Sequence, residues 1–120
     1  MDTLLIGATT FVADVLLSPI IAGPVYQALH ENYEQLPGIV LGSSYAAGGY
    51  FVSSLVTGTP FNGMALTATV GGAAANHATT GRWLYWPIAS KYPKVRNYLG
   101  PIISSTGAMF GKMLYDVATN

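Results

Sequence analysis

The feature that most constrains this chain is a long uncharged stretch, because from Gln35 to Gly81 there is no Asp, Glu, Lys or Arg. A soluble helix or strand needs charged or strongly polar residues on the face that meets water. In the whole chain 8% of residues are charged and 51% are hydrophobic, against about 25% charged in an ordinary soluble domain. The pattern predicts a membrane-inserted protein rather than an unusually apolar soluble domain.

Four apolar segments are candidate membrane spans, and they cover residues 4–29, 37–57, 64–80 and 99–118. About 20 helical residues cross the hydrocarbon core of a bilayer. The first segment contains two prolines, which predicts either a kinked helix or a span that ends near Gly23. The third is rich in Ala, Gly and Thr, which leaves open a shielded span, a re-entrant element or an interfacial loop. The expected fold is all-α: a multi-pass transmembrane helical bundle of three or four helices with short loops, in one domain over residues 1–120.

Residues 82–98 combine four of the five basic residues of the chain with five aromatic residues. Trp and Tyr concentrate at the headgroup level of a membrane, and Lys and Arg mark the side that is not translocated. This segment is therefore expected to lie at the membrane surface, or else to dock on an acidic partner protein. With four spans it shares one face with the acidic loop 30–35, and both termini lie on the other face. The expected anchoring residues are Arg82, Trp83, Tyr85, Trp86, Lys91, Tyr92, Lys94 and Arg96.

Small residues recur every three or four positions in two of the candidate spans, so that they line one face of each helix. Because lipid provides no hydrophobic drive between helices, close backbone approach across small residues is a main source of association. These faces are expected to pack within the chain or against partner subunits. The residues are Gly42, Ala46, Gly49 and Ser53 in the second span, and Gly100, Ser104, Gly107 and Gly111 in the last.

Asp14 is the one acidic residue deep in the first candidate span, with Thr10 and Ser18 one turn away on either side. An aspartate at the centre of a membrane helix costs roughly 2.5–3.5 kcal/mol, so a compensating interaction is expected. One interpretation is an ion or proton site with His77 or Lys112 as partner. The other is a hydrogen-bonded structural carboxyl group that faces neighbouring helices.

The residues that most enzymes and metal sites use are scarce in this sequence. There are no cysteines and two histidines, and the spacing of His30 and His77 supplies no local set of metal ligands. The glycine pairs lack the lysine and hydroxyl of a phosphate-binding loop, and no serine stands in a nucleophile motif. We therefore expect no cofactor, no metal and no enzymatic activity. An embedded enzyme would need to be built around Asp14, Asn76 and His77.

The expected function is that of a non-catalytic structural multi-pass membrane subunit of a larger assembly. A viral minor capsid or inner-membrane protein and an accessory subunit of an organellar membrane complex both fit, so the membrane is that of a virion or of an organelle. Its partners would be the lipid bilayer and other protein subunits. A net charge of zero gives no reason to expect a nucleic-acid partner. The alternative is a homo-oligomeric channel or holin-like pore former.

Overall fold

The computed structural model describes residues 3–29, 36–81, 84 and 86–119. In this part of the chain the regular structure is entirely helical, which confirms the expected all-α class. The helices are α1 (Thr3–Leu29), α2 (Leu36–Thr57), α3 (Gly63–Thr80), α4 (Trp86–Lys91) and α5 (Pro93–Thr119).

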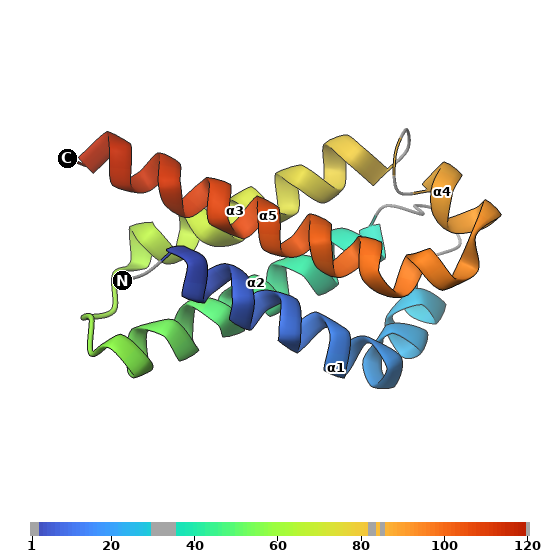
Figure 1. The fold of residues 1–120 in the computed structure, drawn as a ribbon, viewed down its shortest axis with the longest axis horizontal. Helices are drawn as coiled ribbons and strands as arrows, with labels where there is room; N and C mark the ends of the chain where they lie inside the picture. The colour runs from blue at the N-terminus through green and yellow to red at the C-terminus, as the bar shows by residue number, and fades with distance from the viewer. Residues whose placement is uncertain (1–2, 30–35, 82–83, 85, 120) are drawn as a thin grey trace.

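The four long helices run lengthwise and alternate in direction, and each packs against two neighbours in the ring α1–α2–α3–α5 (Figure 1). The short helix α4 lies at one end of the bundle, and both ends of the chain lie at the other (Figure 1). The bundle measures 41 × 26 × 23 Å. Its long axis is comparable with a bilayer, which is about 40–45 Å thick with its headgroups.

Helices α1 and α2 are long and apolar enough to cross a membrane. The qualifying segments are Thr3–Val25, with a mean hydropathy of 2.0, and Leu36–Thr57, with a mean hydropathy of 1.3. Among the described residues, α3 and α5 do not reach the same hydropathy. Two of the four expected spans are thus supported by length and composition.

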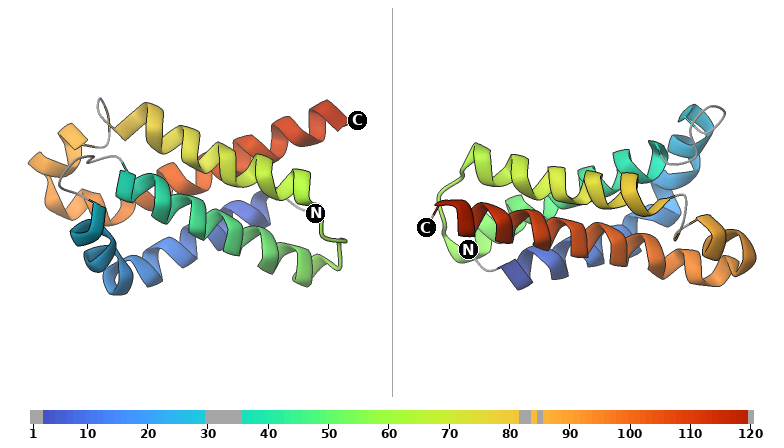
Figure 2. Two further views of the ribbon diagram at one scale, coloured as in Figure 1. Left: turned by 180° about the vertical axis from the view of Figure 1, so that it is seen from behind. Right: turned by 90° about the horizontal axis from the view of Figure 1, so that it is seen from above.

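Helix α1 is continuous from Thr3 to Leu29, with Pro19 and Pro24 inside it. A proline inside a helix removes one backbone hydrogen bond and crowds the carbonyl one turn earlier. The last turns of α1 accordingly point away from the axis of its first part (Figure 2). Of the two expectations for this segment, the kinked helix is the one observed.

The sequence predicts the basic aromatic segment 82–98 as one surface segment that ends before the span 99–118. Its described part is divided between α4 and the first turns of α5, which begins at Pro93 rather than near Leu99. Proline suits the first turn of a helix, where its missing N–H has no partner to lose, and it disfavours helical backbone in the residue before it. Pro93 therefore separates the two helices and starts the second.

The turn between α2 and α3 is fastened by Asn62 and Tyr50. The Asn62 side chain caps α3 by accepting hydrogen bonds from the backbone N–H groups of Met64 (2.9 Å) and Ala65 (3.0 Å). The Tyr50 hydroxyl accepts a hydrogen bond from the Asn62 N–H (3.0 Å) and donates one to its carbonyl (3.2 Å). Asn62 thus defines where α3 begins.

Replacing Asn62 with alanine is expected to lower the free energy of unfolding by about 1 kcal/mol, since the cap of α3 is lost. Thermal unfolding in detergent, followed by circular dichroism, measures this change. Asn62→Asp is the control, because aspartate caps a helix as well as asparagine does. Equal stability of the alanine and aspartate variants would contradict the capping role.

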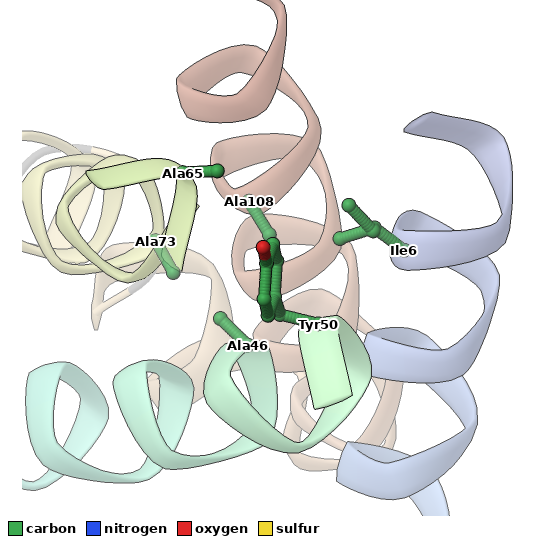
Figure 3. Close-up of a cluster of buried hydrophobic side chains, with 6 residues drawn as sticks. All are labelled: Ile6, Ala46, Tyr50, Ala65, Ala73 and Ala108. Atoms are coloured by element: carbon green, nitrogen blue, oxygen red, sulfur yellow. The ribbon is translucent and has the colours of Figure 1, made fainter. Parts of the chain in front are cut away.

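Small side chains fill the middle of the bundle. A cluster of buried apolar residues contains four alanines, one from α2, two from α3 and one from α5, together with Ile6 and Tyr50 (Figure 3). Tyr50 is the largest fully buried side chain, and its ring lies among the small ones. With so little volume between them, the helix backbones lie close together.

Candidate functional site

The large apolar side chains of this protein lie mostly on the outside. Most belong to α1, α2 and α5, whereas α3 contributes one methionine, and Phe61 and Tyr92 lie in connecting segments. The exposed set is Leu4, Val12, Leu16, Leu17, Ile20, Ile21, Val40, Phe51, Val52, Leu55, Val56, Phe61, Met64, Tyr92, Tyr98, Ile102, Phe110, Met113, Leu114 and Val117. A soluble monomer rarely exposes a contiguous apolar surface of this extent.

The interior, by contrast, holds many polar side chains. Two of them, Asp14 and Lys112, are ionisable groups of the kind that is almost never fully buried without a partner. The buried polar set is Thr10, Asp14, Ser53, Thr69, His77, Ser104, Ser105 and Lys112. In membrane proteins, helices typically place apolar side chains toward the lipid and small or polar side chains toward one another. The described helices have this arrangement.

Hydroxyl groups on the outer faces are satisfied within their own helices. Thr67, Thr79 and Thr106 each donate to the carbonyl oxygen four residues earlier, at 2.6–2.8 Å. Ser44 on α2 does the same at 2.8 Å. Such bonds remove the need for water, so these exposed hydroxyls are compatible with a lipid environment.

Helices α3 and α5 meet backbone against backbone through glycines. A Cβ atom on Gly107 would lie 2.6 Å from the carbonyl oxygen of Gly72 and 2.8 Å from the Cα atom of Ala73. A Cβ atom on Gly111 would overlap the carbonyl oxygen of Ala68. Beside this contact, the Asn76 amide donates to the carbonyl oxygen of Ile103 (2.9 Å) and to Thr106 (3.1 Å). Any larger residue at these glycines would force the two backbones apart.

The contact between α1 and α2 is built in the same way. A Cβ atom on Gly49 would overlap the Thr10 hydroxyl and come within 3.1 Å of the Ile6 carbonyl oxygen. The Thr10 and Ser53 hydroxyls are buried and have no hydrogen-bond partner among the described residues. Of the eight residues expected to pack, seven are buried, and Gly100 is half-buried.

Asp14 is the centre of a hydrogen-bond network that joins all four long helices. One of its carboxylate oxygens accepts a bond from Ser18 at 2.6 Å, and the other accepts one from Ser104 at 2.9 Å. Ser18 in turn contacts the Tyr45 hydroxyl of α2 at 3.0 Å. Ser104 contacts Nε2 of His77 of α3 at 2.8 Å. A single carboxylate thus organises side chains from α1, α2, α3 and α5.

The direction of these bonds follows from the number of hydrogens. A serine hydroxyl has one hydrogen, and both Ser18 and Ser104 donate theirs to Asp14. When Asp14 is ionised, the Tyr45 hydroxyl therefore donates to Ser18, and Nε2–H of His77 donates to Ser104. With an ionised Asp14, every bond in the network points toward the carboxylate, and such bonds strengthen one another in a medium of low dielectric constant.

His77 and Ser104 are packed closely against α2. Cβ atoms on Gly42 and Gly38 of α2 would come within 2.5 Å and 3.1 Å of the imidazole ring, and the one on Gly42 would also lie 2.9 Å from the Ser104 hydroxyl. Glycine at position 42 is what allows the imidazole and the serine hydroxyl to meet. On the α2 side, these described side chains leave no space for a further heavy atom.

Lys112 lies apart from this network. It forms an ion pair with Asp116 one turn later on α5, at 2.5 Å, and its ammonium group lies 5.8 Å from the centre of the Tyr115 ring. Two helical turns separate it from Ser104, a rise of about 12 Å. Of the two partners considered for Asp14, His77 therefore belongs to its network, through Ser104, and Lys112 does not.

Among the expected anchoring residues, Lys91, Tyr92 and Lys94 are exposed at the α4 end of the bundle. The Lys91 ammonium group lies 5.8 Å from the centre of the Tyr92 ring. Arg82, Trp83 and Tyr85 fall outside the described residues, as do the side chains of Trp86 and Arg96.

Several residues of the network and of the packing faces were not expected from the sequence. The spacing of small residues predicts only a packing role for Ser104, although Ser104 bridges Asp14 and His77. The sequence itself predicts no role for Tyr45. Gly72 was noted only as part of a glycine pair. Its position three residues after Thr69 and four before Asn76 is a small or polar face on α3, and this spacing could have identified it.

Comparison of the chain with protein-family models, with curated proteins and with solved structures finds no match in any of the three. Within the residues that the structure describes, no group of three or more His, Cys, Asp or Glu side chains could hold a metal ion. The function of this chain must therefore be inferred from the geometry of the bundle.

Proposed function

We propose that this chain is a non-catalytic structural multi-pass membrane subunit of a larger assembly, with α1, α2, α3 and α5 crossing the bilayer. A viral minor capsid or inner-membrane protein and an accessory subunit of an organellar membrane complex are the two kinds of assembly that it would suit. Both need a small helical body that holds other proteins at a membrane.

The observation that carries this proposal is the inverted distribution of side chains. Leu16 and Leu55 are 64% and 83% exposed, whereas Asp14 is 5% exposed and Thr10 is fully buried. Exposed leucines are stable against lipid, and the buried polar groups bond within the bundle. The lysines at the α4 end would place that end on the cytoplasmic or equivalent side.

The outward face of α3 supports membership of an assembly. Apart from Met64 it presents small residues, with Thr67, Gly71, Ala75 and Thr79 exposed. The outer faces of the other long helices carry leucine, valine, isoleucine or phenylalanine. A face of small residues in a membrane suits close approach of another helix better than contact with lipid chains.

The alternative, a homo-oligomeric pore, draws less support from the geometry. The polar stripe of Thr10, Asp14 and Ser18 faces the inside of one copy, where Asp14 accepts a hydrogen bond from Ser104 and Ser18 contacts the Tyr45 hydroxyl. A pore between copies would need polar groups on an outer face, and the exposed hydroxyls of Thr67, Thr79 and Thr106 are already bonded within their own helices. Gly49, Gly107 and Gly111 likewise already form close contacts between helices of the same copy.

The experiment that tests the proposal is gentle detergent extraction from the native source, followed by size separation and mass spectrometry. We expect the chain to migrate with larger proteins at a fixed stoichiometry, and the purified chain to give no ion flux in liposomes. Recovery as a pure homo-oligomer that conducts ions, with the flux abolished by Asp14→Asn, would contradict the proposal in favour of the pore.

A further inference from the structure

The buried ionisable groups Asp14 and His77 lie on different helices and are joined through one hydroxyl. The distances are 2.9 Å from Ser104 to Asp14 and 2.8 Å from His77 to Ser104. Both ionisable residues are at most 6% exposed, and Ser104 is fully buried. The neighbouring Ser105 hydroxyl bonds within its own helix, to the Ile102 carbonyl oxygen. Ser104 bonds to two side chains from other helices instead.

The charge of the site is not balanced by a described cation. Asp14 of α1 faces Ser18 of its own helix, Tyr45 of α2, and Ser104 of α5 with His77 of α3 behind it, and none of these carries a fixed positive charge. On α5, Lys112 is paired with Asp116. An isolated carboxylate in a low-dielectric interior is costly, and binding a proton is the usual way in which such a group is neutralised.

We infer that Asp14, Ser104 and His77 form one proton-binding site, in which a single exchangeable proton is shared between the carboxylate and the imidazole. The tight packing around the site supports this assignment. Because even a methyl group on Gly42 would come within 2.5 Å of the imidazole and 2.9 Å of the Ser104 hydroxyl, the α2 side of the site leaves no space for an additional heavy atom. A proton is the ligand that fits.

The proton moves between the two groups through the hydroxyl. In one state the imidazole is protonated at both nitrogens and Asp14 is ionised. The Nε2–H bond of His77 then breaks as a new O–H bond forms on Ser104, and the original Ser104 O–H bond breaks as an O–H bond forms on Asp14. The result is a neutral imidazole, a neutral carboxyl group and a reversed Ser104 hydroxyl. Both states have zero net charge, and no electrons are transferred.

The consequence is that His77 and Asp14 titrate as one coupled unit rather than independently. Nitrogen-15 NMR of labelled histidine in lipid vesicles, recorded across a pH series, reports the protonation of His77. His30→Gln is the background, because it leaves His77 as the one histidine. We expect Asp14→Asn to change, by at least about tenfold, the proton concentration at which half of the His77 side chains are protonated. Ser104→Ala should cause most of the same change.

Ser105→Ala is the matched control, since it removes a buried hydroxyl from the next position of α5 that is not part of the network. Its His77 titration should match that of the parent protein. Circular dichroism and size-exclusion profiles establish that each variant is folded, and Ser104→Ala decides the question if Asp14→Asn does not fold. Identical His77 titrations in the parent, Ser104→Ala and Asp14→Asn proteins would overturn the inference.

Discussion

Replacing Gly72 with leucine is expected to abolish the folded bundle. Gly72 lies where α3 meets the backbone of α5, and a Cβ atom there would lie 2.9 Å from the Cα atom of Gly111 and would overlap the carbonyl oxygen of Gly107. Backbone atoms of a packed helix cannot rotate aside as a side chain can. Overpacking costs about 1–3 kcal/mol where neighbours yield, and we expect more than about 3 kcal/mol here. Size-exclusion chromatography and thermal unfolding in detergent measure the loss.

The adjacent Gly71 provides the control, because nothing lies within 4 Å of a Cβ atom built on it. Leucine at Gly71 also replaces a poor helix former with a good one, so the variant should be at least as stable as the parent protein. The same comparison is available on α2, where Gly49 is tightly packed and Gly48 is open. If leucine were tolerated equally at positions 71 and 72, the close backbone contact between α3 and α5 described above would be contradicted.

Replacing Leu16 with aspartate is expected to prevent stable membrane insertion. Leu16 lies on the outer face of α1 and is 64% exposed, within the apolar segment Thr3–Val25. At the centre of a membrane helix, leucine contributes favourably and aspartate costs about 2.5–3.5 kcal/mol. The share of protein that resists alkaline extraction from membranes should therefore fall strongly. In a soluble protein the same exposed substitution would change stability by less than about 0.5 kcal/mol.

Gln27→Asp is the matched control for this change. Gln27 is also exposed on α1, but it lies beyond the apolar segment, toward the α4 end of the bundle. Aspartate there would reach water or headgroups, so insertion should be retained. Full retention of Leu16→Asp in the membrane fraction would argue that the outer face of α1 is not in contact with lipid.

Much of this architecture could be predicted from the sequence because the decisive patterns are local. The charge-free stretch and the length of the apolar segments predict long helices. The recurrence of Gly42, Ala46, Gly49 and Ser53 identifies the buried face of α2, since helical periodicity alone determines which residues share a face. Asp14 could also be singled out from the sequence, as the one acidic residue deep in the first apolar segment.

The remaining features depend on how the helices meet, which one sequence does not contain. Ser104 became a bridge because α5 places it between α1 and α3, and its sequence neighbours give no sign of that. The contact of Gly72 with Gly107 likewise requires the register of α3 against α5. The start of α5 at Pro93 was missed because the basic and aromatic residues there suggested a surface segment, although proline is suited to a first helical turn.

The measurement that tests the central claim most directly is the accessibility of the outer face in lipid vesicles. The chain contains no cysteine, so single cysteines at Leu16, Leu55 and Phe110 can each carry a nitroxide label. We predict that oxygen, which dissolves in lipid, will collide with all three labels more often than a polar reagent does, while a label at Lys94 shows the reverse. If the polar reagent reaches Leu16, Leu55 and Phe110 as readily as it reaches Lys94, these side chains face water and the account of a membrane-spanning bundle is contradicted.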